Sequence, residues 1–131
     1  MFAIGLPVAL FVTFADPDRL MSEWFGPPQD GAWIAETLDG ERPANRYTLG
    51  IRWGRIIGGY DGCNHWSYVE SDGDVARMTT LMACDPRPDI AYGAVAIDPK
   101  VTMLGEDRMR LEARGHVATF RRMTDAELET P

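Results

Sequence analysis

The most constraining feature of this chain is a glycine-rich segment, GGYDGCN, which runs from Gly58 to Asn64 and contains Cys63. Cys84 is the only other cysteine among the 131 residues. Glycines inside a strand-like segment favour a bulge, a sharp bend or a close approach of two backbones. The fold must therefore turn tightly around Cys63 and must accommodate Cys84, either paired or free.

The residues before this segment alternate between apolar and polar side chains. We expect one face of a strand to carry the apolar set Tyr47, Leu49, Ile51 and Trp53, and the other face to carry Arg46, Thr48 and Arg52. Gly54 turns the chain, and a returning strand passes through Ile56, Gly58 and Tyr60. After the glycine-rich segment, Asp72 and Asp74 flank Gly73 in a pattern typical of a hairpin turn. A strand-like run, Thr79 to Met82, then leads to Cys84.

The C-terminal half combines one helical pattern with further strands. Asp85-Pro86 favours a helix start, apolar residues recur at helical spacing at Ile90, Ala94 and Ile97, and Pro99 ends the element. Alternation then returns in three short runs separated by turns at Gly105 and Gly115, with Val101 and Met103, then Met109, Leu111 and Ala113, then Ala118 and Phe120 facing inward. The pattern predicts a mainly β (α+β) fold, a small antiparallel and partly open β-barrel with one short inserted helix.

The two cysteine motifs resemble those of the META domain, the family that includes the HslJ heat-shock proteins. Gly59, Gly62, Cys63 and Asn64 match its G-x-x-GCN turn, and Thr80, Met82 and Cys84 match its T-x-M-x-C element. The resemblance covers the chain from about Trp33 to Arg121. It implies a barrel-like domain of the bacterial cell envelope with a role in stress or in tolerance of toxic compounds.

We divide the chain into three parts. Residues 1–30 form a signal- or anchor-like segment, a short helix over Asp18–Phe25 and a linker; residues 31–123 form the META-like domain; residues 124–131 form an acidic flexible tail. The apolar run Phe2–Phe14 has the length of a secretory h-region, and Thr13-Phe14-Ala15 is an acceptable cleavage site, although no Lys or Arg precedes Arg19. We expect export to the periplasm or a membrane tether; the alternative is an N-terminal element packed on the domain.

The two cysteines have four interpretations. In an exported protein Cys63 and Cys84 are expected to form a disulfide, whereas in the cytosol they would be buried free thiols. A metal site from Cys63, His65 and Cys84, with Asp61 or Asp85, has poor ligand spacing. Nucleophilic catalysis by Cys63 would need His65 or the distant His116 as its base. We therefore predict the disulfide, and no catalytic, metal or cofactor-binding residue.

The net charge and the aromatic residues indicate which kinds of partner the protein could bind. Thirteen basic and 20 acidic residues give a net charge of −7, which disfavours nucleic acid. Five arginines near the C-terminus are predicted to lie on solvated strand faces: Arg108, Arg110, Arg114, Arg121 and Arg122. A candidate interaction surface is formed by Tyr60, His65, Trp66 and Tyr68, although core packing is the commoner use of such aromatics. Gly59, Gly62 and Asn64 are assigned to formation of the turn.

These observations lead to a functional hypothesis. We expect a non-enzymatic, disulfide-pinned scaffold that binds an envelope protein or a small hydrophobic ligand, with membrane contact only through the N-terminal segment. The alternative is a ligand-binding or enzyme-inhibitor barrel. A wide apolar cavity lined by Trp53, Tyr60 and Met103 would support that alternative, and a filled interior would count against it.

Overall fold

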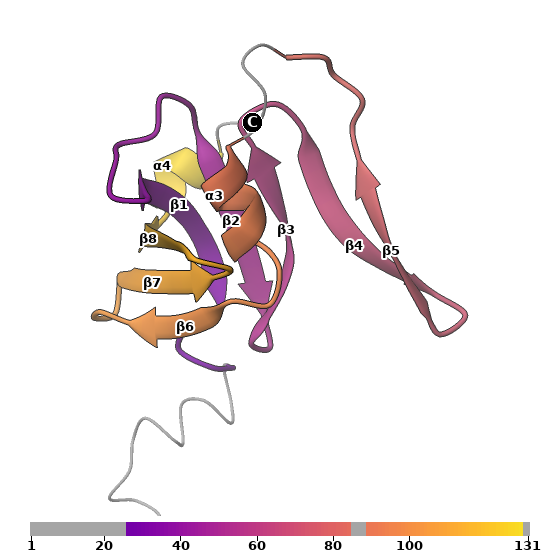
Figure 1. Ribbon diagram of the computed structural model, residues 1–131. Helices are drawn as coiled ribbons and strands as arrows, with labels where there is room; N and C mark the ends of the chain where they lie inside the picture. The colour runs from indigo at the N-terminus through magenta and orange to yellow at the C-terminus, as the bar shows by residue number, and fades with distance from the viewer. Residues whose placement is uncertain (1–25, 85–88, 130–131) are drawn as a thin grey trace, which may run out of the picture.

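The computed structural model describes residues 26–84 and 89–129. The predicted helix over Asp18–Phe25, the signal-like segment and the helix start at Asp85-Pro86 lie outside these residues. The described chain forms eight strands and two short helices (Figure 1): β1 Gly31–Leu38, β2 Tyr47–Arg52, β3 Arg55–Asp61, β4 His65–Ser71, β5 Asp74–Thr79, α3 Ile90–Val95, β6 Lys100–Met103, β7 Arg108–Ala113, β8 His116–Arg122 and α4 Asp125–Leu128.

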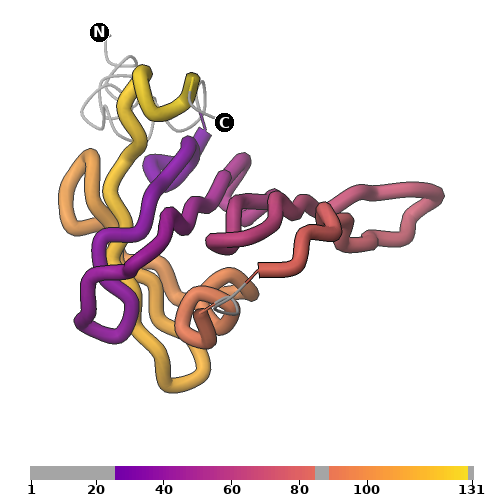
Figure 2. The backbone as a smooth tube through the Cα atoms, turned by 90° about the horizontal axis from the view of Figure 1, so that it is seen from above, coloured from indigo at the N-terminus to yellow at the C-terminus, as the bar shows by residue number. Residues whose placement is uncertain are grey.

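All eight strands belong to one antiparallel sheet. Its order is β5-β4-β3-β2-β1-β8-β7-β6, so that β5 and β6 each have a strand neighbour on one side only within the described chain. The sheet bends around α3, while the β4–β5 hairpin extends away from the body (Figures 1 and 2). The predicted mainly β, partly open barrel-like fold is confirmed, with a second short helix, α4, in addition to the one expected.

The core lies on the face of the sheet that the period-two pattern predicted. Tyr47, Leu49 and Ile51 are buried, and Met109 and Leu111 of β7 are completely buried. The core also includes Trp33, Leu38, Trp66, Ala91, Tyr92, Val95, Ala96, Ala118 and Phe120. The prediction is wrong for Trp53, which is 63% exposed. Strand β2 ends at Arg52, and Trp53 begins the turn with a left-handed backbone (φ 52°), which points its side chain away from the core.

Helix α3 fills the interior of the bent sheet. The Asp89 carboxylate caps it by accepting hydrogen bonds from the backbone N–H groups of Ala91 (2.7 Å) and Tyr92 (3.1 Å). The expected buried face is wrong, because Ile90 is 78% exposed while Ala91, Tyr92 and Val95 are buried. The helix has only six residues, too few for the apolar spacing to define one face, and the large Tyr92 side chain faces the core.

Tyr92 ties this helix to the sheet by two hydrogen bonds. Its hydroxyl donates to the Thr48 carbonyl oxygen (2.6 Å) and accepts from Nε1 of Trp66 (2.9 Å). Burial raises the pKa of Tyr92 well above its ordinary value. The hydroxyl therefore stays neutral and able to donate, and the barrel interior is occupied by bonded side chains.

The glycines of β2 and β3 permit a bulge and a close approach, as predicted. The β2–β3 register shifts between Gly50 and Ile51. At Gly59 a side chain would collide with the Thr48 carbonyl oxygen and the Tyr92 hydroxyl. Only hydrogen fits at this position, because the strand lies directly against the helix and its neighbouring strand.

The residues predicted as a linker are tied to the body. The Asp30 carboxylate accepts hydrogen bonds from the backbone N–H groups of Trp53 (2.5 Å) and Gly54 (2.8 Å). Arg122 donates from Nη1 to the Asp30 carbonyl oxygen (2.8 Å), and its guanidinium lies 4.3 Å from the centre of the Trp33 ring. Residues 26–30 thus belong structurally to the domain that we expected to begin at residue 31.

The acidic tail forms a capped helix in its described part. Thr124 and Glu127 make a capping box at the start of α4, and the Arg121 guanidinium donates to both Glu127 carboxylate oxygens (2.7 Å each). The hydrogen bonds from Arg121 lower the pKa of Glu127 to about 2. This carboxylate therefore stabilises the fold at pH values above its ordinary pKa, and the contribution is lost as the pH falls towards 2.

None of the helices in the described ranges has the length and apolar composition needed to cross a bilayer.

Candidate binding site at the disulfide and the β4–β5 hairpin

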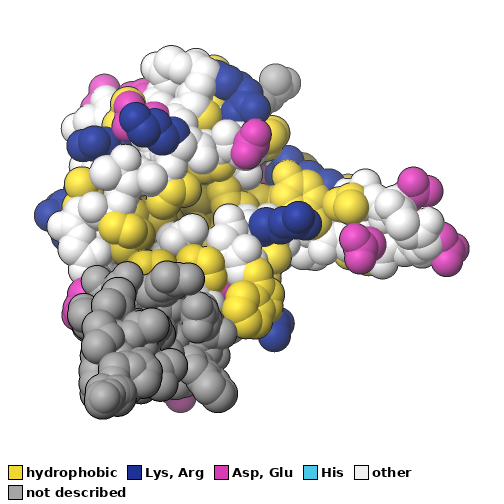
Figure 3. Space-filling model, turned by 90° about the horizontal axis from the view of Figure 1, so that it is seen from below, with side chains coloured by type: hydrophobic (Ala, Val, Ile, Leu, Met, Phe, Trp, Pro, Cys, Tyr) yellow, Lys and Arg dark blue, Asp and Glu magenta, His cyan; other side chains and the backbone are white. Residues whose placement is uncertain are grey.

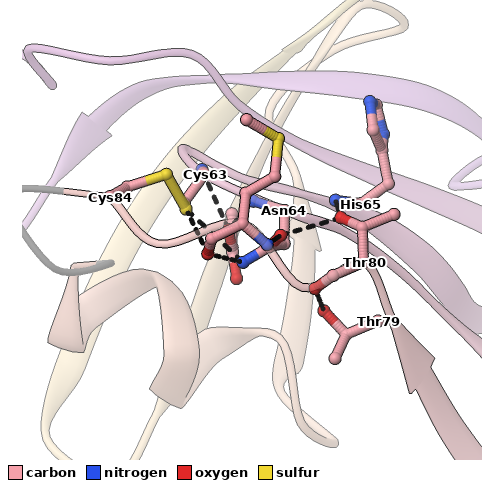
Figure 4. The surroundings of a disulfide bond; sticks show 8 residues. Cys63, Asn64, His65, Thr79, Thr80 and Cys84 are labelled. Atoms are coloured by element: carbon pink, nitrogen blue, oxygen red, sulfur yellow. Dashed lines mark hydrogen bonds between the residues drawn. A yellow bond between two sulfur atoms is a disulfide. The ribbon is translucent and has the colours of Figure 1, made fainter.

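The two cysteines form the predicted disulfide. Cys63 follows β3, Cys84 follows β5, and their Cα atoms lie 5.8 Å apart (Figure 4). The strand-like run that leads to Cys84 is only partly a strand, because β5 ends at Thr79 and the residues after it are irregular. The bond therefore fixes an irregular segment to the end of the central strand β3.

The side chain of Asn64 joins the two cysteine motifs (Figure 4). Its Oδ1 accepts hydrogen bonds from the Met82 backbone N–H (2.7 Å) and the Thr80 hydroxyl (2.8 Å), and its Nδ2 donates to the Met82 carbonyl oxygen (3.1 Å). The carboxamide thus pairs with Met82 as a neighbouring strand would. The assignment of Asn64 to the turn covers only part of its role: its backbone N–H bonds within the turn, and its side chain holds the second motif against the first.

Asp61 and Gly62 make the turn itself. Oδ1 of the buried Asp61 accepts hydrogen bonds from the backbone N–H groups of Cys63 (3.0 Å) and Asn64 (2.6 Å). Gly62 adopts a left-handed backbone (φ 87°) against the Tyr47 ring. The role of Gly62 in the turn was predicted from the sequence, whereas the role of Asp61 was not. The available signal was an Asp two residues before a cysteine in a glycine turn, a spacing suited to side-chain capping of the backbone.

Disulfide formation removes the groups required by the thiol and metal hypotheses. A hollow of about 420 Å³ does have both Cys63 and His65 in its wall. However, the Cys63 sulfur is bonded to Cys84, so the oxidised protein has no thiolate to act as a nucleophile or as a metal ligand. The His65 ring packs instead against Tyr60, with ring centres 4.7 Å apart.

The four residues of the candidate interaction surface do not share one face. Tyr60 and His65 are directly paired across β3 and β4, so they lie on the side of the sheet opposite to the core. Trp66 is 4% exposed and belongs to the core, which corrects its assignment to the surface. Tyr68 is partly exposed and packs edge-on against Trp66 at 5.5 Å between ring centres. The predicted surface is therefore reduced to the pair Tyr60 and His65 on one face and to Tyr68 on the other.

An apolar groove lies on the outer face of the sheet, where β3 meets β4. Its volume is about 540 Å³, and the glycines Gly50 and Gly58, directly paired across β2 and β3, contribute to its wall. The remaining wall residues are Ala32, Thr48, Leu49, Ile57, Gly59, His65, Trp66, Ser67, Met78, Thr79, Thr80 and Met123. The groove was not predicted from the sequence, because Gly50 and Gly58 become neighbours only in this strand register.

The β4–β5 hairpin extends beyond the groove, and the outer edge of β5 pairs with no other strand of the described residues; we call it the free edge of β5. Strand β4 pairs with β3 through three residue pairs, Gly58–Ser67, Gly59–Trp66 and Tyr60–His65, and then diverges. Every residue of β5 is exposed. Met78 lines the groove, whereas Val75 lies three positions away on the other face of the strand. Acidic side chains lie at the far end of the hairpin, where the sequence has Glu70, Asp72 and Asp74 (Figure 3).

The cavity that would have supported a barrel-type ligand site is not formed. Trp53, Tyr60 and Met103 do not line a common pocket among the described residues; Tyr60 borders the hollow beside the disulfide, and Trp53 lies in an exposed turn. Trp33, Tyr92 and Phe120 occupy the interior and are almost completely buried. The filled interior counts against a ligand held inside the barrel.

Comparison with known proteins supports no functional inference. The chain matches no protein-family model and no curated protein sequence. Among solved structures, it is similar to the NMR structure of a protein from Burkholderia xenovorans, with 21% sequence identity and a TM-score of 0.43. The alignment covers 80% of this chain and 88% of the other. Functional inference therefore rests on the groove, the hairpin and the disulfide of this chain.

Proposed function

We propose that this chain is a non-enzymatic binding module of the cell envelope, similar to META and HslJ domains, that holds an extended apolar segment of a partner protein. The observation that carries the proposal is the apolar groove beside the free edge of β5. An extended peptide can add to such an edge through backbone hydrogen bonds while its alternate side chains enter the adjoining groove.

Shape and charge favour a segment of protein as the occupant. The groove lies open on the sheet beside an unpaired strand edge, whereas the interior of the barrel is filled. Met78 lies at the groove, and Asp74 lies towards the acidic end of the same strand. A complementary segment would have apolar side chains near Met78 and a basic side chain near Asp74.

The disulfide and the sequence resemblance support the envelope location. Disulfides persist in oxidising compartments and are rare in the cytosol, which fits export through the signal-like N-terminus. The META resemblance of the two cysteine motifs supports a role in stress or in tolerance of toxic compounds. In this proposal the disulfide and the Asn64 bonds keep both ends of the hairpin fixed to β3.

The second candidate is a small-ligand or inhibitor module that uses the same groove. Its volume of about 540 Å³ lies within the usual range for small-molecule sites, which is roughly 300–1,000 Å³. A neutral apolar molecule would then occupy the groove without pairing to the backbone of β5. The two candidates therefore differ in whether the edge of β5 becomes hydrogen-bonded on binding.

A peptide-selection experiment tests the groove. We expect ten-residue peptides selected on the oxidised protein to carry alternate apolar residues and a basic residue. Met78→Lys should weaken their binding about tenfold or more, because it places a charge in the apolar groove. Val75→Lys is the matched control, since Val75 and Met78 are similarly exposed, at 64% and 59%, on opposite faces of one strand. The control should change affinity less than about twofold.

Hydrogen exchange on the same complexes separates the two candidates. A bound strand should protect backbone amides of β5, whereas a small apolar ligand such as Nile red should compete for the groove without protecting them. Equal weakening by Met78→Lys and Val75→Lys would contradict a site in the groove. Failure to select any peptide, together with Nile red binding that only Met78→Lys removes, would favour the second candidate.

Export is tested by the intact mass of the protein recovered from its native host under non-reducing conditions. We expect a species that begins near Asp16 and lacks the two hydrogens of the Cys63 and Cys84 thiols. A full-length species with both thiols free would contradict the envelope location, because it would show neither cleavage nor an oxidising environment.

A further inference from the structure

A second cavity, independent of the proposed function, is surrounded by arginines. It lies beside the loop between β1 and β2, has a volume of about 540 Å³ and is lined by the guanidinium-bearing residues Arg42, Arg46, Arg108 and Arg121. Glu36 is the only carboxylate in its wall. The other wall residues are Ile34, Ala35, Thr37, Gly40, Pro43 and Asn45. Such a positive cavity is unexpected in a chain with a net charge of −7.

Carboxylates neutralise only part of this charge. Glu36 accepts from Nε of Arg108 (2.8 Å), and Glu127 of α4 accepts from Arg121. Arg46 donates from Nη2 to the Glu127 carbonyl oxygen (3.0 Å). Arg42 is exposed and makes no hydrogen bond or ion pair within residues 26–84 and 89–129. Arg42 is thus available to a ligand that enters this cavity.

The strand register adds to this concentration of positive charge. Arg108 of β7 and Arg121 of β8 are direct cross-strand partners. Like charges in this relationship repel and destabilise a sheet. Glu36 and Glu127, which lie outside the two strands, reduce this repulsion by pairing with the two arginines. A bound anion would reduce the repulsion further. An anion in this cavity would therefore stabilise the fold as well as bind the Arg42 guanidinium.

We propose that this cavity binds a phosphate-type oxyanion, either free or as the headgroup of an anionic lipid. Guanidinium groups match the oxygens of phosphate by paired N–H donors, and charge-assisted bonds of this kind are among the strongest available. Arg42 and Arg108 are the principal ligands, because Arg46 and Arg121 also hold α4. Glu36 competes with the anion for Arg108, since both accept from the same guanidinium.

Calorimetric titration and vesicle binding test this site in the oxidised full chain. The probes are inorganic phosphate, pyrophosphate, and vesicles of phosphatidylcholine with or without phosphatidylglycerol. Arg42→Gln/Arg108→Gln should weaken binding about tenfold or more. The loss should be seen with inorganic phosphate and pyrophosphate if the ligand is free phosphate, and with the phosphatidylglycerol vesicles if it is a lipid headgroup. Arg52→Gln/Arg55→Gln removes the same charge from exposed arginines at the β2–β3 turn, and should change affinity less than about threefold. Unchanged thermal unfolding of both variants excludes loss of the fold.

A third variant should change the affinity for the anion in the opposite direction. Glu36→Gln should tighten binding about two- to fivefold, because it removes the competitor for Arg108. Weaker binding by this variant would overturn the proposed geometry. The proposal is also overturned if neither probe class distinguishes Arg42→Gln/Arg108→Gln from the wild type, or if both double variants weaken binding equally, since either result assigns any binding to overall charge.

Discussion

Replacing Cys63 and Cys84 together by alanine is expected to lower the free energy of unfolding by about 3 kcal/mol. The bond joins residues 21 positions apart and restricts the unfolded chain more than the folded one. The Asn64 side chain still bonds to Met82 in the variant, so the native arrangement of the two motifs should persist. The expected loss is therefore one of overall stability, with the fold retained.

Urea unfolding followed by tryptophan fluorescence measures this difference. Reductant should bring the wild type close to the double variant and should leave the variant unchanged. A difference below about 1 kcal/mol would contradict the expectation, because it would show that the disulfide adds little to a loop already closed by other contacts.

Gly59→Ala is expected to destabilise the protein by about 3 kcal/mol or more. The new methyl group would overlap the Thr48 carbonyl oxygen and the Tyr92 hydroxyl, so that either the strands separate or the Tyr92 hydrogen bonds break. Overpacking costs about 1–3 kcal/mol, and an unsatisfied buried polar group costs a similar amount. The thermal unfolding midpoint and the chemical denaturation curve should both move to milder conditions.

Gly93→Ala provides the matched control for this substitution. Gly93 lies within α3, and an added methyl group would have no heavy atom within 4 Å. Alanine is favoured over glycine inside a helix, so this variant should gain about 0.5–1 kcal/mol. If the two glycine variants lost equal stability, the loss at Gly59 could not be assigned to the collision with Thr48 and Tyr92.

The fold could be predicted from the sequence where the two-residue period of a strand determines which side chains are buried. Alternation placed Leu49 and Leu111 in the core, because one face of each strand is buried and the side-chain period of a strand is two. The helix α3 was predicted on its wrong face, since six residues do not define an amphipathic stripe and the burial of Tyr92 depends on Thr48 and Trp66, distant in sequence.

Of the candidate site, only the disulfide and the glycine turn beside it could be predicted from the sequence. The cysteines and Gly62 carry local signals, but the role of Asn64 depends on Met82, eighteen residues later. The groove and the arginine cavity depend on strand register: Gly50 meets Gly58, and Arg108 meets Arg121, only when the strand pairing is known. No pattern within a single segment contains this information.

The three residue pairs that join β4 to β3 have a consequence for how this architecture can diversify. Beyond them, Val69 to Ala76 is exposed, so its length and side chains are not constrained by core packing. Insertions at the Asp72-Gly73 turn should be tolerated, as they are at other exposed loop tips. If the proposed function holds, the exposed part of the hairpin could change its side chains and its partner without any change in the core.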